Sequence, residues 1–149
     1  MSSSFSKNWG DGAPIKLDPL DYRDLPEVLK QCGRAVVREI TRCVLEKVKP
    51  SGVAQKQNAP STILAKGHDH PVVEKRFRFA REATYSVSPL EQNRVMITTV
   101  SPEDAEIGAH LEAHGYDFFG ITDAASEEAY RIMDTYLCQK VNEAFGGKR

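Results

Sequence analysis

The sequence predicts an α+β domain in which an antiparallel sheet of three to four strands is packed by a long N-terminal and a C-terminal helix. Apolar residues recur at three- and four-residue steps over 24–48 and over 123–145, the period of amphipathic helices. Between them, over 77–100, apolar and polar residues alternate as in half-buried strands. Because each pattern is apolar on one side only, we expect two layers, with both helices on one face of the sheet.

Residues 1–23 are predicted to form an extended arm outside a single domain that spans residues 24–149. The arm contains glycines and prolines but few clustered apolar residues. Large apolar side chains spaced along such a segment either fold back or dock on another subunit. We therefore take four of them as interface residues: Phe5, Trp9, Ile15 and Leu17.

The first helix is expected to begin at Asp24 as its N-cap. Pro26 follows closely, and Glu27 stands three residues after Asp24, as in a capping box. Pro50 ends the helix. Its apolar stripe comprises Leu25, Val28, Leu29, Cys32, Val36, Ile40, Cys43, Val44 and Val48.

Residues 49–72 are predicted to be a long irregular loop, because they include three prolines and two glycines and show little periodicity. The loop has no acidic residue before Asp69. It is either a flexible basic loop or a segment that is ordered only by its neighbours in an assembly. We take Lys56 and Lys66 as its interface residues.

An antiparallel hairpin is expected next, with its turn within 88–93. The apolar face of its first strand comprises Phe77, Phe79, Ala83, Tyr85 and Val87.

A short helix should begin at Ser101 or Pro102, with Gly115 as its C-terminal cap. A short strand over 117–121 should follow, and Thr122 or Asp123 should cap the last helix, which runs to about residue 145. The apolar stripe of this helix comprises Ala129, Ile132, Met133, Tyr136, Leu137, Val141 and Phe145.

Length and composition restrict the class of protein. The chain has 149 residues and a net charge of −1, which indicates one domain and no global field favouring nucleic acid or an acidic membrane. No apolar run is long enough to span a membrane, and no secretory signal is expected. Cys32, Cys43 and Cys138 are an odd set without a close pair, which favours a reducing compartment. All three are expected on apolar helix faces, as small buried hydrophobes.

The histidines form two pairs, His68 with His70 and His110 with His114. Positions four apart share one helix face, so His110 and His114 have the spacing of two zinc ligands. Glu112 lies midway between them and therefore on the opposite side of the helix, which removes the general base of a zinc protease. No third ligand is indicated by spacing, so we expect no metal, no cofactor and no catalytic residue.

The stretch AEIGAHLEAHGYDFFGITDAASEEAYRIMDTYL, residues 105–137, resembles the C-terminal signature of the small lambdoid tail-component family of tailed phages. These are the neck and tail-completion proteins of the head–tail junction. Gly115 matches the family's glycine, and either His110 or His114 stands for its histidine. The family's F-L-G-x-S/T-D turn is matched by Phe118, Phe119, Gly120, Ile121, Thr122 and Asp123. Both phenylalanines are expected to anchor this turn in the core.

The sequence departs from the family at two points. Tyr116 and Asp117 replace its arginine–proline pair, and its threonine-glycine-x-leucine motif is missing at the end of the loop, where AKGHDHPV stands. The matching motifs cover only about a quarter of the chain.

The resemblance implies a structural virion protein of the neck, made in the host cytoplasm, and not an enzyme. Its expected partners are itself or neighbouring subunits in a six-fold ring, a connector or head-completion protein, and a tail-terminator or tail-tube protein. Contact with DNA in the channel would be incidental, and no membrane is involved. Two alternatives remain open: a small metal-dependent enzyme that uses the four histidines, and a soluble inhibitor or adaptor that binds one protein.

Overall fold

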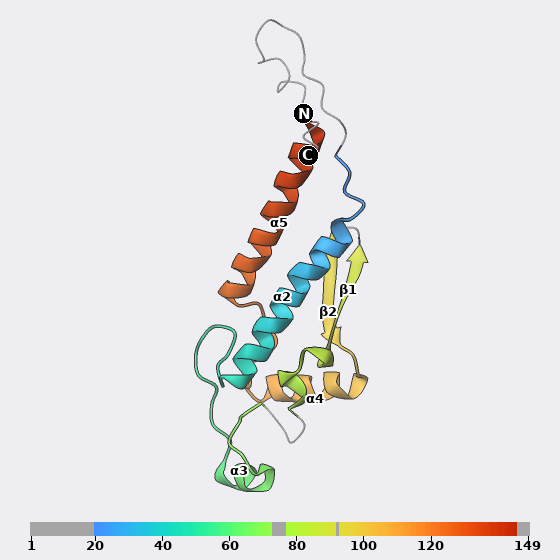
Figure 1. Cartoon of the computed structure of the whole chain (residues 1–149). Helices are drawn as coiled ribbons and strands as arrows, with labels where there is room; N and C mark the ends of the chain where they lie inside the picture. Colours follow the sequence, from blue (N-terminus) through green and yellow to red (C-terminus); the bar gives the residue numbers. More distant parts are fainter. Residues whose placement is uncertain (1–19, 73–76, 92, 146–149) are drawn as a thin grey trace, which may run out of the picture.

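The computed structural model describes residues 20–72, 77–91 and 93–145 (Figure 1). The helices within them are α2 (Leu25–Leu45), α3 (Pro60–Lys66), α4 (Pro102–Ala113) and α5 (Asp123–Ala144). The strands are β1 (Tyr85–Glu91) and β2 (Arg94–Thr99), which pair antiparallel as a hairpin. None of the helices in these three ranges is long and apolar enough to cross a membrane.

The helix α2 lies in the middle of the molecule, with α5 along one side and the hairpin along the other (Figure 1). The expectation that both long helices pack on one face of the sheet is therefore wrong, because α5 packs on α2 instead. The α4 helix lies across the end of this arrangement, beside the base of the hairpin (Figure 1).

The sheet has two strands in the described part of the chain, so the prediction of three to four strands is also wrong. Residues 78–84, expected to be strand, form two short 3-10 turns, Arg78–Ala80 and Glu82–Thr84. Side chains satisfy backbone groups here, since the Tyr85 hydroxyl donates to the Phe79 carbonyl at 2.7 Å and the Thr84 hydroxyl donates to the Arg78 carbonyl. Residues 117–121 form no strand either, for a reason given with the candidate site.

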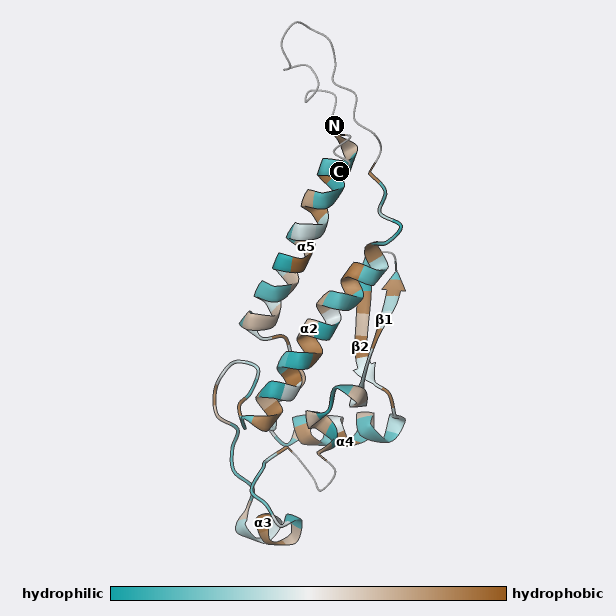
Figure 2. Ribbon diagram, in the orientation of Figure 1, coloured by the Kyte–Doolittle hydropathy of each residue, from teal (hydrophilic) through white to brown (hydrophobic). Residues whose placement is uncertain are grey.

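The core lies where α2, the hairpin and α4 meet. The predicted α2 stripe is confirmed at its centre, where Val36, Ile40 and Val44 are buried. Phe79 is fully buried and its ring lies 4.7 Å from that of Phe118. Figure 2 shows hydrophobic residues along α2 and both strands of the hairpin. Burial of this apolar surface is the main favourable contribution to folding.

The start of α2 differs from the predicted capping box. Asp24 is the N-cap residue, but its side chain caps no backbone N–H. Its carboxylate instead accepts a hydrogen bond from the Tyr136 hydroxyl at 2.8 Å and lies 3.3 Å from Lys140 Nζ. Asp24 therefore connects the beginning of α2 to α5.

The helix α2 ends earlier than expected, at Leu45 and not near residue 48. Lys47 has a positive φ of 62°, and Val48 forms an isolated bridge with Ala54. The loop that follows is not wholly irregular, since it contains α3. Two buried side chains fix it to the domain: Gln55 donates to the Asp117 carbonyl, and Asn58 accepts from the Tyr116 hydroxyl at 3.0 Å.

The other helix boundaries agree closely with the sequence. Ser101 caps α4 by accepting a hydrogen bond from Glu103 N at 3.1 Å, and Thr122 caps α5 by accepting one from Ala125 N at 3.0 Å. The prediction that all three cysteines are buried is wrong for one of them. Cys32 and Cys43 are buried, whereas Cys138 is exposed.

Candidate functional site

The turn between α4 and α5 is organised by Glu112. Its carboxylate accepts hydrogen bonds from the backbone N–H of Phe118 at 3.1 Å and of Phe119 at 3.0 Å. These N–H groups are therefore satisfied by a side chain, which explains why no strand forms here. Glu112 therefore has a structural role that the sequence analysis did not predict. Its position six residues before a glycine-containing turn is a weak signal in the sequence.

The two phenylalanines of this turn have different environments. Phe118 is only 2% exposed, which confirms the prediction that it is anchored in the core, and it packs on Phe79. Phe119 is 43% exposed, so the expectation that it anchors the core is wrong. Its ring stacks over Tyr85 with 6.2 Å between the centroids, and its outer face is open to solvent.

The remaining turn residues fix the chain path. Gly115 follows α4 with a φ of +88°, a conformation that favours glycine. A Cβ on Gly120 would lie 3.1 Å from Cγ of Pro50, so glycine permits a close approach to the loop. Thr122 also donates to Glu39 of α2 at 3.3 Å, while Asp123 is exposed in the first turn of α5, where it complements the helix dipole.

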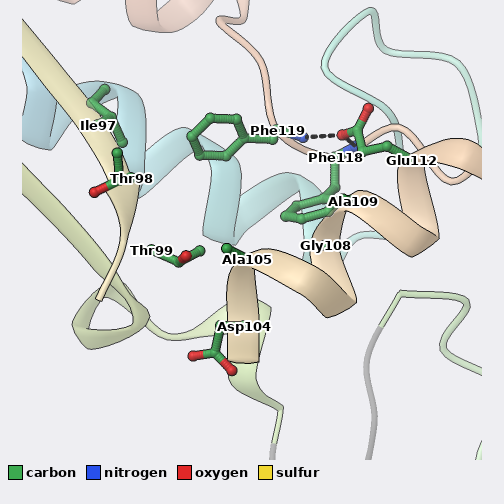
Figure 3. A pocket seen from close by; sticks show the side chains of 10 residues that line it. All are labelled: Ile97, Thr98, Thr99, Asp104, Ala105, Gly108, Ala109, Glu112, Phe118 and Phe119. Carbon is green, nitrogen blue, oxygen red and sulfur yellow. Dashed lines mark hydrogen bonds between the residues drawn. The ribbon is translucent and has the colours of Figure 1, made fainter. Parts of the chain in front are cut away.

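A groove of about 360 Å³ lies beside this turn, between β2 and α4 (Figure 3). In Figure 3, the ring of Phe119 extends from the turn toward Ile97 of β2. Two carboxylates also line the groove, those of Asp104 and Glu112. Asp104 pairs with Arg78 at 2.5 Å, and Glu112 holds the turn. Both acids therefore have structural partners.

The histidines remain two separate pairs. The rings of His110 and His114 lie 4.2 Å apart, and those of His68 and His70 lie 5.8 Å apart. Glu112 lines the groove on the other side of α4, as the helical spacing predicted. Within the described ranges, no three His, Cys, Asp or Glu side chains are grouped to hold a metal ion.

The structure brings the predicted interface lysines together with one histidine pair. Lys56, Lys66, His110 and His114 line a second cavity of about 370 Å³, which we call the lysine–histidine pocket. Its other lining residues are Asn58, Thr62, Pro71, Val72, Phe79, Ile107, Leu111 and Tyr116. The sequence placed the lysines in a loop but gave no sign that this loop folds against α4.

The arm residues Phe5, Trp9, Ile15 and Leu17 lie outside the described residues. The chain enters the described part at Leu20, and Tyr22 packs on Tyr136 of α5 with 6.4 Å between the ring centroids. The last residues of the predicted arm therefore lie beside α5.

A second surface of α5 was not anticipated. Several of its apolar residues, expected to pack inward, are exposed, with Phe145 at 63%. Tyr130 is exposed as well, at 75%. We define the outer stripe of α5 as Tyr130, Leu137, Val141 and Phe145.

Comparison of the chain with known family models, curated proteins and solved structures found no match.

Proposed function

We propose that the chain is a structural protein of the head–tail junction of a tailed phage, one subunit of a ring between the connector and the tail tube. The observation that carries this proposal is the outer stripe of α5. The inner face of α5 is already used, because Ala125, Tyr136 and Ala144 are buried. The outer stripe is therefore additional apolar surface, and each of its members is at least 42% exposed.

The spacing of the outer stripe makes it one continuous surface. Its members are separated by seven, four and four residues, which places them within a narrow sector of a helix with 3.6 residues per turn. Isolated apolar residues are normal on a protein surface, but a contiguous row of large ones is typical of an interaction site.

The position of the arm supports the same function. Tyr22, near the end of the predicted arm, contacts Tyr136 of α5. The predicted role of the arm residues Phe5, Trp9, Ile15 and Leu17 in a subunit interface belongs to the same proposal. The resemblance of the 118–123 turn to the neck family is the reason to place this assembly in a virion.

The alternative of an adaptor or inhibitor would use the same outer stripe, and a phage experiment separates the two. In a phage that encodes the chain, deletion of its gene should yield DNA-filled heads and separate tails. The wild-type gene supplied in trans should restore joined particles. A gene lacking codons 2–20 should not restore them, although its product folds. Joined particles at normal yield without the gene would contradict the proposal and favour the adaptor.

A further inference from the structure

We propose that the outer edge of β2 accepts the N-terminal arm of a neighbouring copy as a third strand, with an aromatic side chain of the arm in the groove between β2 and α4. The inference deepens the proposed function and rests on it for the source of the arm. Three observations carry it: the outward backbone groups of β2, the apolar groove beside them, and the pattern of residues 2–9.

The backbone of β2 has groups that point away from β1. The Val100 N–H donates to the Thr84 carbonyl at 2.9 Å, which continues the ladder of the hairpin beyond its last strand pair. Hydrogen-bonded and non-hydrogen-bonded pairs alternate along an antiparallel ladder. Val95, Ile97 and Thr99 therefore stand at non-hydrogen-bonded positions, and their N–H and C=O groups are directed to the outer edge. Among the described residues, β1 is the only strand that pairs with β2.

The outer edge of β1 is less suited to the addition of a strand. Pro89, which lies opposite Val95, has no N–H, and proline is typical of strand edges that resist pairing. The N–H of Tyr85 already donates to the Glu82 carbonyl. Tyr85 and Pro89 therefore offer no donor to an added strand, so β2 is the edge that can accept one.

The groove lies directly beside this edge, since Ile97 and Thr99 line it. Its other walls include the small residues Gly108 and Ala109 of α4 and the ring of Phe119, which points toward Ile97 (Figure 3). A volume of about 360 Å³ has room for one phenylalanine or tryptophan side chain. Such a side chain would cover the exposed face of Phe119, and contacts between aromatic rings are favourable beyond the burial of their area.

The sequence of the arm fits this edge and this groove. Residues 2–9 contain neither proline nor glycine, so each of them can take part in a ladder. Phe5 and Trp9 are four residues apart, and a strand would therefore place both on one face. Lys7 shares that face, and residues 2–9 include no acid, whereas Glu112 gives the groove a carboxylate.

Exchange of the arm between copies suits a ring. Each copy offers one arm and one β2 edge, so the contact is head-to-tail, and contacts of this type close into rings when the rotation between copies permits. Residues 10–19 extend to about 35 Å at most, which lets residues 2–9 reach a neighbouring copy. The added strand would also make the hairpin a three-stranded sheet, which is more stable than two strands alone.

Fluorescence of Trp9, the one tryptophan of the sequence, tests this proposal. A synthetic peptide of residues 1–19 is titrated with the full chain that carries Trp9→Phe, so that only the peptide contains tryptophan. We expect saturable binding with a shift of the emission to shorter wavelength, because Trp9 leaves water when the peptide adds to β2.

Two variants of the full chain locate the binding site. Val95→Pro removes an outward N–H but no hydrogen bond to β1, and it should weaken binding of the peptide about tenfold or more. Val95→Ala, which truncates the same side chain and keeps the N–H, is the matched control. Phe119→Ala, which removes a wall of the groove, should also weaken binding and replaces Val95→Pro if that variant does not fold.

The wild-type chain shows whose arm occupies the edge. Its Trp9 emission should shift as the protein concentration rises, as exchange between copies requires. A Trp9 that is shielded equally at every concentration would assign the edge to the chain's own arm and overturn the exchange. The proposal is also overturned if the peptide does not bind saturably, or if the Val95→Pro chain binds it as tightly as the Val95→Ala chain does. Either failure leaves the proposed function to the phage experiment, whose readout is the joining of heads to tails.

Discussion

Replacing Phe118 by alanine should sharply destabilise the fold. The side chain is 2% exposed, contacts Phe79 at a ring distance of 4.7 Å, and would touch a Cβ placed on Gly108 at 3.2 Å. Truncation therefore leaves a cavity among rigid neighbours. Phe→Ala at a buried site costs about 3–5 kcal/mol, a large part of the roughly 5–15 kcal/mol that stabilises a typical domain.

Phe119→Ala is the matched control, because it makes the same chemical change one residue away. Phe119 is half-exposed, and its ring contacts those of Tyr85 and Phe118 at its edge of the core, so we expect a loss of only about 1 kcal/mol. Urea unfolding followed by circular dichroism gives both values, and Phe118→Leu provides a milder variant if Phe118→Ala does not fold. Equal losses at the two positions would refute the assignment of Phe118 as the anchor.

Three further changes test other contacts. Glu112→Ala should cost about 1–3 kcal/mol in the same assay, because it removes the acceptor of two backbone N–H groups. Glu112→Gln should cost less, and equal costs would contradict the role of Glu112 as that acceptor. Gly33→Ala should lower the melting temperature, since the new Cβ would lie 2.5 Å from Cγ1 of Val87, and this penalty should vanish in a Val87→Ala background. The hydrogen bond from Tyr136 lowers the pKa of Asp24. The ionised Asp24 therefore stabilises the fold fully above the ordinary aspartate pKa, and this stabilisation declines as the pH falls below about 4. Asp24→Asn should flatten that part of a profile of stability against pH, and an unchanged profile would count against the contact.

The helices were predictable because their signals are local. Spacing and capping residues located α2, α4 and α5 to within a few residues, with Ser101 and Thr122 as observed caps. The same reasoning failed where side chains bind the backbone over longer distances. The alternation over 77–87 resembles a strand, but tertiary packing of Phe79 and bonds from Tyr85 and Thr84 favour 3-10 turns there.

The candidate sites were predictable in part. Lys56 and Lys66 were selected from charge alone, and helical spacing placed His110 and His114 on one face opposite Glu112. Their convergence on one pocket depends on how the loop folds against α4, which no local pattern encodes. Similarly, the sequence indicated one apolar stripe along α5, and only the contact with α2 shows which part of it remains exposed.

The central claim is that the outer stripe of α5 is buried in an assembly. Native mass spectrometry should be applied to the full chain, alone and with the portal, connector and tail-tube proteins of the same phage. We predict a multi-copy ring, formed alone or with one of these partners. Leu137→Ser/Val141→Ser should stay folded but monomeric, whereas Gln139→Ser/Asn142→Ser, at exposed polar positions of the same helix, should assemble normally. A wild-type chain that is monomeric in every mixture, or a Leu137→Ser/Val141→Ser variant that assembles like the wild type, would contradict the account.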